Sequence, residues 1–380
     1  MRVHILGTRG YPSSYGGFET LLRHLAPYLV RRGHQVSVFD RRGPTDPSRL
    51  HDLAPDVAAT ARNGGSWDVG GVRVRRSRGL SGTSTSTLTH GLTSAVVTAK
   101  ECPDVALVMN VANGFFLPAL RSRGVPTVLN VDGIEWERAK WSPMGRYVFR
   151  SGARLSARWA DTLVADSRAI AARWETEFGR RSVFIPYGGD ENPPADRDRL
   201  SPWGLVPGSY VLIVARLVPE NNVVPMLRGA LLTGAAVVVV GSGAGSPTER
   251  EVAALGGHPQ VITLGHVSDQ HLLSTLWTHC GAYLHGHSVG GTNPALLQAM
   301  GLGAPVLALD TPYNREVLVD PRHLVPLDPQ VVGQHLREVL DSPTLRGELV
   351  RSARRRVLDV YNWTSVCQAY ESALLDRVAH

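Results

Sequence analysis

The stretch Leu284-His-Gly-His-Ser-Val-Gly-Gly-Thr-Asn-Pro-Ala-Leu-Leu-Gln-Ala-Met300 decides the fold of this chain. An apolar strand ends at His285, and a glycine-rich loop then leads into a helix at Pro294. Proline suits the first helical turn, and Thr292 or Asn293 suits the capping position before it. The glycines let backbone N–H groups approach a ligand, and the helix N-terminus carries partial positive charge. The stretch therefore predicts a strand, loop and helix that cradle a diphosphate.

This loop also has a purely structural alternative, in which it is a capped turn that binds nothing. A lone pair of glycines favours that alternative. Here His285 and His287 stand among several further polar or glycine positions, which favours the ligand-binding interpretation.

A second candidate loop follows the strand in Val211-Leu-Ile-Val-Ala-Arg-Leu-Val-Pro-Glu-Asn-Asn222. In an open parallel sheet, ligands bind beyond the carboxyl ends of the strands. We therefore expect Arg216 to face the same mouth as Gly291 and to clamp the diphosphate. The structural alternative is a surface arginine paired with Glu220.

Strand-like and helix-like patterns alternate along both halves of the chain. In the first half they predict elements over Val3–Leu6, Phe18–Arg32, Gln35–Asp40, Val105–Met109, Phe115–Arg123 and Thr127–Val131. In the second half they predict strands over Tyr210–Val214, Ala236–Val240, Val261–Leu264, Ala282–His285 and Pro305–Leu309. Such alternation is typical of parallel sheets with helical crossovers, so we expect an α/β fold with one sheet in each half.

The segment Asn192–Pro207 is rich in proline, aspartate and arginine, a composition typical of an exposed linker. We therefore expect two domains, residues 1–195 and 196–380. A final helix over Trp363–Val378 is expected to pack back on the first domain. Two segments are expected as surface loops or weakly patterned helices: Pro44–Gly70 and Ser81–Thr89.

The bulk properties exclude several classes of protein. No apolar stretch approaches the roughly 18 residues that cross a bilayer. The N-terminus resembles a buried strand rather than a signal peptide, so we expect a cytoplasmic protein. The three cysteines lack the spacing of metal ligands or of a disulfide framework. The net charge of +7 is carried by arginine, which favours anionic partners without choosing among sugar nucleotides, anionic lipids and nucleic acid.

A third candidate loop, also rich in glycine, is Gly7-Thr-Arg-Gly-Tyr-Pro-Ser-Ser-Tyr-Gly-Gly-Phe-Glu19, which follows the first strand and opens a helix. Gly16 and Gly17 place a flexible loop and a helix N-terminus where a phosphate or an acceptor can bind. A tight structural turn is the alternative.

A fourth segment is Asn130-Val-Asp-Gly-Ile-Glu-Trp-Glu-Arg-Ala-Lys-Trp141, where a buried strand runs into three carboxylates, two cations and two tryptophans. Asp132 comes first after the strand and is best placed to bind sugar hydroxyls or to polarise a reacting group. Glu135 is its rival for this role. The structural alternative is that Asp132 caps the following turn.

The turn Val237-Val-Val-Val-Gly-Ser-Gly-Ala-Gly245 resembles a dinucleotide-binding fingerprint. A full fingerprint needs a glycine where Ser246 stands, and it follows the first strand of its unit rather than the second. The sequence thus argues against a nicotinamide or flavin oxidoreductase, and no cofactor is expected.

Four arginines, Arg146, Arg150, Arg154 and Arg158, recur at every fourth position and form one cationic stripe on a helix. Aromatic residues flank the stripe, as on a helix that lies on a membrane surface or binds an anionic acceptor. A solvated helix face is an equal alternative.

Taken together, these segments resemble glycosyltransferase family 4 with the two-domain GT-B fold, and more narrowly its rhamnosyltransferase-type subgroup. The resembling blocks lie in order along nearly the whole chain, at 7–19, 130–136, 165–167, 218–222, 285–294 and 314–317. The resemblance implies two Rossmann-like domains that face each other across a cleft, with the nucleotide sugar bound by the second and the acceptor by the first. It also implies a retaining, metal-independent transfer.

The resemblance assigns roles to individual residues. Catalytic roles fall to Asp132 and Arg216. The expected donor-binding residues are Gly16, Gly17, Asn221, His287, Gly291, Thr292, Asn293 and Gln298. The expected acceptor-binding residues are Tyr15, Glu135 and Trp136, and no metal ligand is expected.

The chain departs from the broad family at three places. Two glutamates of the family's donor loop correspond to Gly290 and Gln298, and the second of them would hold the ribose hydroxyls. The family's phosphate-binding lysine corresponds to Asn221, so a second cation must come from elsewhere, with Arg315 as a candidate. A histidine common among relatives corresponds to Asp132.

We therefore expect a hexosyltransferase that uses a dTDP-, UDP- or GDP-linked sugar, with a deoxyhexose such as rhamnose as the leading donor sugar. The acceptor is a glycan, a lipid-linked molecule or a small metabolite, and nucleic acid is not an expected partner. Peripheral contact with the inner face of a membrane is an open possibility. Two alternatives are a nucleotide-sugar-binding protein that has lost its chemistry, and an epimerase or phosphorylase on the same fold.

Overall fold

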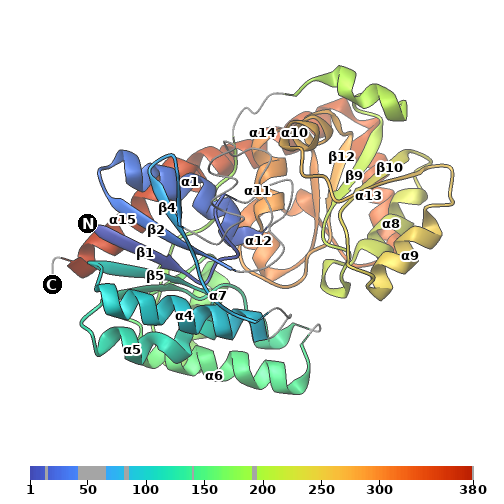
Figure 1. Ribbon diagram of the computed structural model, residues 1–380. Coiled ribbons are helices and arrows are strands. Elements are labelled where there is room, and N and C mark those ends of the chain that lie inside the picture. Colours follow the sequence, from blue (N-terminus) through green and yellow to red (C-terminus); the bar gives the residue numbers. More distant parts are fainter. Residues whose placement is uncertain (13–15, 42–65, 81–84, 139–140, 191–194, 379–380) are drawn as a thin grey trace. The chain divides into compact units, whose positions relative to one another are not determined.

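The computed structural model describes residues 1–12, 16–41, 66–80, 85–138, 141–190 and 195–378 (Figure 1). The chain divides into two compact units. Unit 1 comprises Met1–Pro186 and Thr364–His380, and unit 2 comprises Tyr187–Trp363.

The division after Pro186 lies nine residues before the expected boundary at 195. The reason is that the chain already packs on unit 2 from Tyr187 onwards. A Cβ atom added to Gly189 would lie 2.6 Å from the carbonyl oxygen of Leu297, so the backbone passes directly over a helix of unit 2. Gly189 also forms a parallel bridge with Asn362.

Unit 1 contains an eight-stranded sheet in the order β3-β4-β2-β1-β5-β6-β7-β8. All neighbouring strands are parallel except β3 and β4, which form an antiparallel pair. The strands are β1 (Arg2–Leu6), β2 (Gln35–Asp40), β3 (Trp67–Val69), β4 (Val72–Arg76), β5 (Val105–Met109), β6 (Thr127–Asn130), β7 (Thr162–Ala165) and β8 (Val183–Phe184). The central strands are buried and apolar, as expected for a sheet covered on both faces.

Helices connect these strands: α1 (Gly17–Arg31), α4 (Thr85–Glu101), η1 (Val111–Phe116), α5 (Leu117–Arg121), η2 (Glu135–Glu137), α6 (Pro143–Trp159) and α7 (Arg168–Phe178). Helices α4, α5 and α6 form one layer of unit 1 (Figure 1). The last helix, α15 (Trp363–Val378), lies on this unit as expected. Asn130 donates a hydrogen bond of 2.6 Å to the Tyr370 hydroxyl, and Glu371 accepts hydrogen bonds from Tyr28, Arg32 and His34.

Unit 2 contains a six-stranded parallel sheet in the order β11-β10-β9-β12-β13-β14. The strands are β9 (Tyr210–Val214), β10 (Ala236–Val240), β11 (Val261–Gly265), β12 (Ala282–His285), β13 (Val306–Leu309) and β14 (Leu324–Val325). The helices are η3 (Arg197–Trp203), η4 (Pro219–Asn221), α8 (Val223–Leu231), α9 (Pro247–Leu255), α10 (Gln270–His279), α11 (Pro294–Gly301), α12 (Pro312–Leu318), η5 (Pro321–His323), α13 (Pro329–Asp341) and α14 (Pro343–Val360).

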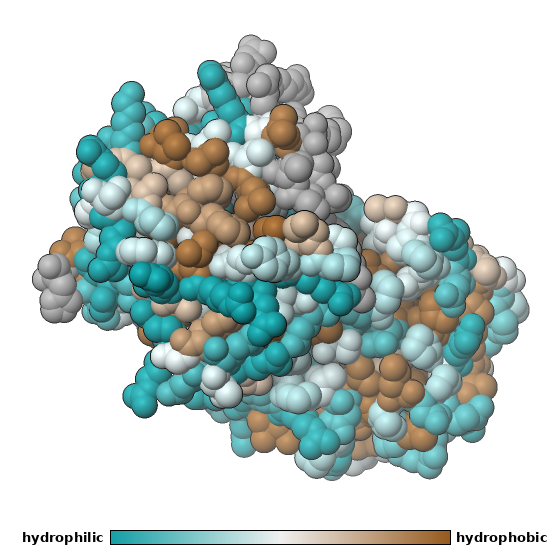
Figure 2. All heavy atoms as spheres, turned by 90° about the horizontal axis from the view of Figure 1, so that it is seen from below, coloured by the Kyte–Doolittle hydropathy of each residue, from teal (hydrophilic) through white to brown (hydrophobic). Residues whose placement is uncertain are grey.

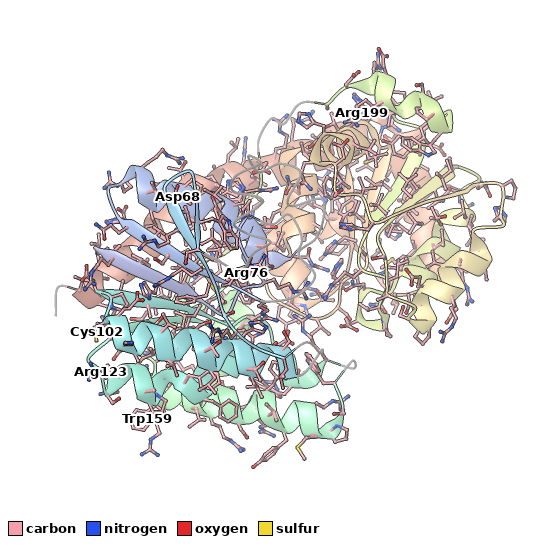
Figure 3. All side chains as sticks on the ribbon, in the orientation of Figure 1. Asp68, Arg76, Cys102, Arg123, Trp159 and Arg199 are labelled. Atoms are coloured by element: carbon pink, nitrogen blue, oxygen red, sulfur yellow. The ribbon has the colours of Figure 1, made fainter. Side chains whose placement is uncertain are left out.

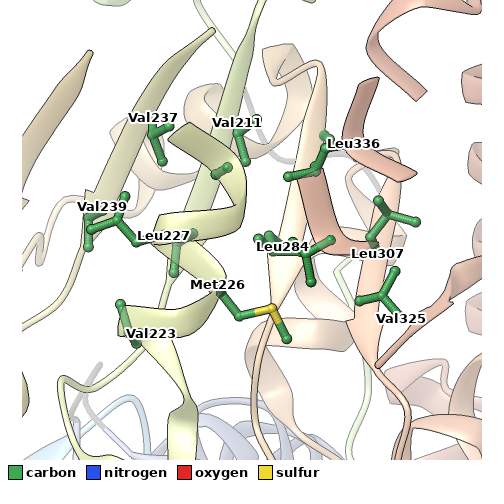
Figure 4. Close-up of a cluster of buried hydrophobic side chains, with 14 of the residues drawn as sticks. Val211, Val223, Met226, Leu227, Val237, Val239, Leu284, Leu307, Val325 and Leu336 are labelled. Atoms are coloured by element: carbon green, nitrogen blue, oxygen red, sulfur yellow. The ribbon is translucent and has the colours of Figure 1, made fainter. Parts of the chain in front are cut away.

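The core of unit 2 lies between this sheet and helices α8 and α13 (Figure 4). Val211, Val237 and Leu284 on the strands pack there with Leu227 and Leu336 on the helices, and each side chain is at most 1% exposed. Gly229 lets α8 and α13 approach, because a Cβ atom there would lie 2.8 Å from the Pro329 carbonyl oxygen. On the strand side of this core, β9 and β12 pair in parallel.

Two expectations about loops need correction. The described part of the expected linker is largely exposed, but it belongs to unit 2 and contains η3, where Leu200 is buried with 1% of its surface exposed. Trp67–Val69, expected in a loop, forms the edge strand β3, because Trp67 can bury its ring against β4. Most of Pro44–Gly70 lies outside the described residues. Among the helices that the structure describes, none is long and apolar enough to cross a membrane.

Candidate functional site

The sheet of unit 2 reverses its strand order between β9 and β12. From β9 the chain moves outward through β10 to β11, and then returns to β12 on the other side of β9. Loops that leave the carboxyl ends of the two central strands diverge at such a point, and a crevice for a ligand forms between them. The loops after β9 and β12 are the two that the sequence predicted to hold the diphosphate together.

Hydrogen bonds join these two loops. The Asn222 side chain donates to the carbonyl oxygen of Gly286 at 2.8 Å. The backbone N–H and the hydroxyl of Ser288 both donate to the carbonyl oxygen of Glu220, at 3.0 and 2.8 Å. A Cβ atom on Gly286 would lie only 2.4 Å from the Asn221 carbonyl oxygen. The two loops therefore form one continuous rim.

Asn314 joins a third loop to this rim. Its side-chain amide donates to the carbonyl oxygens of Leu309, at 2.8 Å, and His287, at 3.2 Å. The residue is 3% exposed and lies in α12, beyond the carboxyl end of β13. Asn314 begins the block 314–317 that resembles the family, but the resemblance assigned it no role. Its position in a helix that follows a predicted strand was the feature that could have indicated one.

Two histidines of the rim stack on each other. The rings of His285 and His287 lie 4.2 Å apart with an interplanar angle of 11°. His285 is buried, which lowers its pKa to about 3, and the Tyr283 hydroxyl lies 3.1 Å from its Nδ1 atom. His285 is thus neutral near pH 7, and its ring stacks on the half-buried His287.

The predicted capped helix after β12 is confirmed. Helix α11 begins at Pro294, and the Asn293 side chain accepts a hydrogen bond of 2.9 Å from the N–H of Ala295. Gly290 has φ of +118°, a conformation that side-chain-bearing residues rarely adopt. This explains why glycine rather than glutamate stands there. Contacts of Gly291, Thr292 and the helix N-terminus with a diphosphate stay a prediction.

The loop after β9 presents Arg216, whose side chain is half-buried. The amide of Asn221 donates to the Arg216 carbonyl oxygen at 2.8 Å, and Asn221 is only 2% exposed, so its side chain shapes this loop. Within the described part of the chain no ion pair joins Arg216 to Glu220, which leaves the guanidinium available. Arg315, the candidate second cation, is instead held by both carboxylate oxygens of Asp310.

Gln298 has a carboxylate partner that sequence reasoning missed. Its Nε2 atom donates to Oδ2 of Asp190 at 2.6 Å, and both side chains are half-buried. Asp190 is held in place by its backbone, because a Cβ atom on Gly301 would lie 2.2 Å from its carbonyl oxygen. Asp190 stands 108 residues from Gln298 in the sequence, so no local pattern could reveal the pair.

The glycine turn after β10 is occupied by the protein itself. The Glu249 carboxylate accepts hydrogen bonds from the backbone N–H groups of Gly243, at 2.8 Å, and Gly245, at 2.5 Å. These are the amides that a dinucleotide phosphate would need. The turn also follows the second strand of its unit, which agrees with the argument against a dinucleotide site.

In unit 1, Asp132 lies at the carboxyl end of β6 beside Asn110, which follows β5. The Asn110 amide donates to Oδ2 of Asp132 at 3.1 Å, and the two residues have φ of +72° and +62°. Such left-handed backbone at non-glycine residues is costly and concentrates at functional sites. The Asp132 carboxylate is thus directed toward Asn110 rather than toward a cap on the following turn, whose N-cap is Ile134.

Glu135 and Trp136 are buried in unit 1, at 4% and 7% exposed. Glu135 forms an ion pair with Arg138 and accepts a hydrogen bond of 3.0 Å from the Trp141 indole. The Trp136 ring packs edge-on against Trp174 and Phe178. These contacts anchor the segment after Asp132, and contact with an acceptor stays a prediction.

Gly16, with φ of +124°, is the N-cap of α1, and Gly17 begins that helix. The Glu19 carboxylate, in the first turn of α1, accepts a hydrogen bond from the N–H of Arg9. Tyr15, the remaining predicted acceptor contact, lies outside the described residues. Among the residues that the structure does describe, no group of three or more His, Cys, Asp or Glu side chains could hold a metal ion.

The fold has known counterparts. Sucrose-phosphate synthase from Thermosynechococcus elongatus superimposes with a TM-score of 0.79 at 16% identity, over 100% of this chain and 99% of that one. The Anabaena protein HepE, solved in complex with UDP and glucose, superimposes with a TM-score of 0.74 at 17% identity, over 99% and 100% of the two chains. The family model "Glycosyl transferase 4-like domain" matches residues 16–188, and "Glycosyl transferases group 1" matches residues 207–356. The chain is a GT-B glycosyltransferase.

This glycosyltransferase also resembles a curated protein over its full length. The MMP alpha-(1->4)-mannosyltransferase of Mycolicibacterium hassiacum is 27% identical over 424 aligned positions, which cover 100% of both chains. The first family model covers most of unit 1, and the second covers most of unit 2. The residues matched by the second include the rim built by the loops after β9, β12 and β13. The narrower resemblance to rhamnosyltransferases is not confirmed by these matches.

Proposed function

We propose that this glycosyltransferase transfers a hexose from a nucleotide diphosphate to a hydroxyl group of its acceptor, with retention of anomeric configuration. The observation that carries the proposal is the rim of unit 2, where the loops of Arg216 and His287 are bonded together next to the capped N-terminus of α11. This is where a parallel sheet binds a ligand, and a helix N-terminus favours a diphosphate.

The proposed chemistry asks the protein to stabilise a leaving group. The bond from the sugar C1 atom to the diphosphate oxygen breaks, and a bond from C1 to the acceptor oxygen forms on the same face of the sugar. The acceptor proton passes to the departing diphosphate. Arg216 and the backbone N–H groups of Gly291 and Thr292 stabilise the negative charge that develops there. A divalent metal ion is not required, because these groups supply the positive charge.

The pair Asp190 and Gln298 is the proposed contact for the ribose. A carboxylate can accept hydrogen bonds from two neighbouring hydroxyl groups, and Gln298 orients that carboxylate through its amide. Asp190 thus supplies the negative charge that Gln298 itself lacks. In unit 1, the proposed role of Asp132 is to bind a hydroxyl group of a reacting sugar.

The donor sugar proposed first is a deoxyhexose such as rhamnose. The relative from M. hassiacum is named a mannosyltransferase, so mannose is the sugar to compare with it. HepE was solved with UDP and glucose, which supports a nucleotide-linked donor in general. The acceptor is a glycan, a lipid-linked molecule or a small metabolite.

A donor panel tests the proposal. The full-length protein is incubated with dTDP-rhamnose, GDP-mannose and UDP-glucose, and thermal shift and release of the nucleoside diphosphate are measured with and without EDTA. Donor binding, EDTA-resistant release with an acceptor, and a product with the anomeric configuration of the donor would support it. Binding without turnover across a broad acceptor panel would instead favour a protein that has lost its chemistry. No thermal shift with any donor would contradict the proposal.

A further inference from the structure

Helix α6 of unit 1 presents a face made of arginines to solvent. Arg146, Arg150, Arg154 and Arg158 are all exposed, whereas the opposite face buries small residues and Phe149. The helix contains no aspartate or glutamate over its 17 residues. The stripe that the sequence predicted is thus a feature of the surface.

The arginines do not all have carboxylate partners. Arg150 forms an ion pair of 2.9 Å with Glu177 of α7. The Arg158 guanidinium lies over the Trp159 ring, 5.2 Å from its centroid. No carboxylate of the described residues forms an ion pair with Arg146 or Arg154. The positive charge of this helix is therefore largely uncompensated by carboxylates of the residues that the structure describes.

Large apolar side chains accompany the arginines. Met144 and Tyr147 on the first turns of α6 are 71% and 66% exposed. On α4, which packs against α5 in the same layer, Leu92 and Val96 are 50% and 57% exposed. Seen from below, this side of the chain shows apolar residues gathered beside a hydrophilic band (Figure 2). Trp159, at the other end of α6, lies at the outer edge of the layer (Figure 3).

We propose that α6 docks unit 1 onto the surface of a bilayer that contains anionic phospholipids. The arginines would contact the headgroups while Met144 and Tyr147 enter the boundary of the acyl chains. An interfacial helix combines a strongly basic polar surface with apolar and aromatic residues in this way. Arginine suits lipid phosphates because its planar guanidinium donates two hydrogen bonds at once.

The charge pattern favours a lipid surface over a folded protein partner. A folded protein partner would need an acidic surface that matches this helix in shape, whereas an anionic leaflet attracts every basic side chain that comes near it. All of the residues involved lie in unit 1, so the proposal does not depend on the donor chemistry of unit 2. Failure of the membrane proposal would therefore not count against the proposed donor chemistry, and the reverse also holds.

Vesicle sedimentation tests the proposal with the full-length protein. Wild type is expected to bind vesicles of equimolar phosphatidylcholine and phosphatidylglycerol, to leave pure phosphatidylcholine vesicles unbound, and to bind less as salt rises. The variant Arg146→Gln/Arg154→Gln/Arg158→Gln should bind about a hundredfold more weakly, because each of the three basic residues adds about fivefold near an anionic leaflet. The control Arg228→Gln/Arg351→Gln/Arg355→Gln removes the same charge from exposed positions of unit 2 and should bind like wild type.

A second variant separates lipid from other polyanions. Met144→Ser/Tyr147→Ser keeps all charges and should weaken vesicle binding by about tenfold, because it removes the apolar area that the bilayer would bury. Thermal unfolding of each variant checks that the fold is kept. The proposal is overturned if wild type does not bind the anionic vesicles, or if the unit 2 control loses as much binding as the α6 variant. It is also overturned if Met144→Ser/Tyr147→Ser binds like wild type and heparin competes, which would indicate a site for soluble polyanions.

Discussion

The amide nitrogen of Gln298 lies 2.6 Å from a carboxylate oxygen of Asp190 and donates a hydrogen bond to it. A neutral residue is therefore suited to position 298, because a glutamate there would bring two carboxylates into contact. Such neighbours cannot both ionise without a strong mutual penalty. The apparent loss of a family carboxylate is thus accompanied by a carboxylate from another part of the chain.

This pair predicts that Gln298→Glu will not improve the enzyme. We expect it to lower the affinity for the nucleotide donor and to lower the thermal midpoint, because two like charges meet. Asp190→Asn should weaken donor binding as well. The double variant Asp190→Asn/Gln298→Glu should recover much of the loss, since it restores one carboxylate and one amide. Isothermal titration with the donor measures the cycle, and strictly additive effects would contradict the pairing.

The close approach of the two rim loops predicts that Gly286→Ala is severely damaging. The new methyl group would meet the Asn221 carbonyl oxygen, which is backbone and cannot swing away. We expect lower stability and a loss of donor binding. Gly257→Ala is the matched control, because its nearest neighbour would be 3.8 Å away. Equal thermal midpoints and donor affinities for the two variants would argue against a rigid rim.

Asn314 predicts a stability effect with a functional consequence. Asn314→Ala removes a buried amide and leaves the carbonyl oxygens of Leu309 and His287 without that donor. We expect a loss of about 1–3 kcal/mol in the free energy of unfolding, measured by urea denaturation. Weaker donor binding should accompany it, because the His287 loop is released. Gln330→Ala, at an exposed amide on α13, should change neither quantity.

The free guanidinium of Arg216 predicts a kinetic effect without a stability effect. Arg216→Gln should lower kcat by about 10²–10³, the usual result of removing one group that stabilises a developing negative charge. Its thermal midpoint should stay near that of wild type. Arg315→Gln removes the same charge from a residue that is paired with Asp310, so its kcat should be close to normal. Comparable losses of kcat in both variants would remove the reason for assigning the clamp to Arg216.

Glu371 predicts an acid-sensitive attachment of the last helix. Burial acts to raise the pKa of this carboxyl, but hydrogen bonds from His34, Tyr28 and Arg32 outweigh it and hold the pKa below its usual value. A depressed pKa contributes stability above the unfolded pKa that is lost as pH falls through the folded pKa. Glu371→Gln should thus lower the urea midpoint at pH 7, and the difference from wild type should shrink toward pH 3. A difference independent of pH would show that the charge is irrelevant.

Much of the fold was predictable because its elements are locally encoded. Strands β2, β5, β9, β10 and β12 have the predicted boundaries, since β2 alternates polar and apolar residues and each of the others is a largely apolar run. The cap at Asn293 and the start of α11 at Pro294 likewise follow from neighbours within three residues. The edge strand β3 escaped prediction, because its three residues form a strand only through pairing with β4.

Only part of the candidate site could be predicted from the sequence. The sequence alone determined that two loops follow buried strands, the second of them rich in glycine, and that Arg216 and Gly291 belong to these loops, because strand and turn propensities act over a few residues. Tertiary structure decided that Asn314 fastens the His287 loop and that Asp190 stands against Gln298. These contacts depend on which backbones pass within hydrogen-bonding distance, and the strand order of the sheet sets that rather than any local pattern.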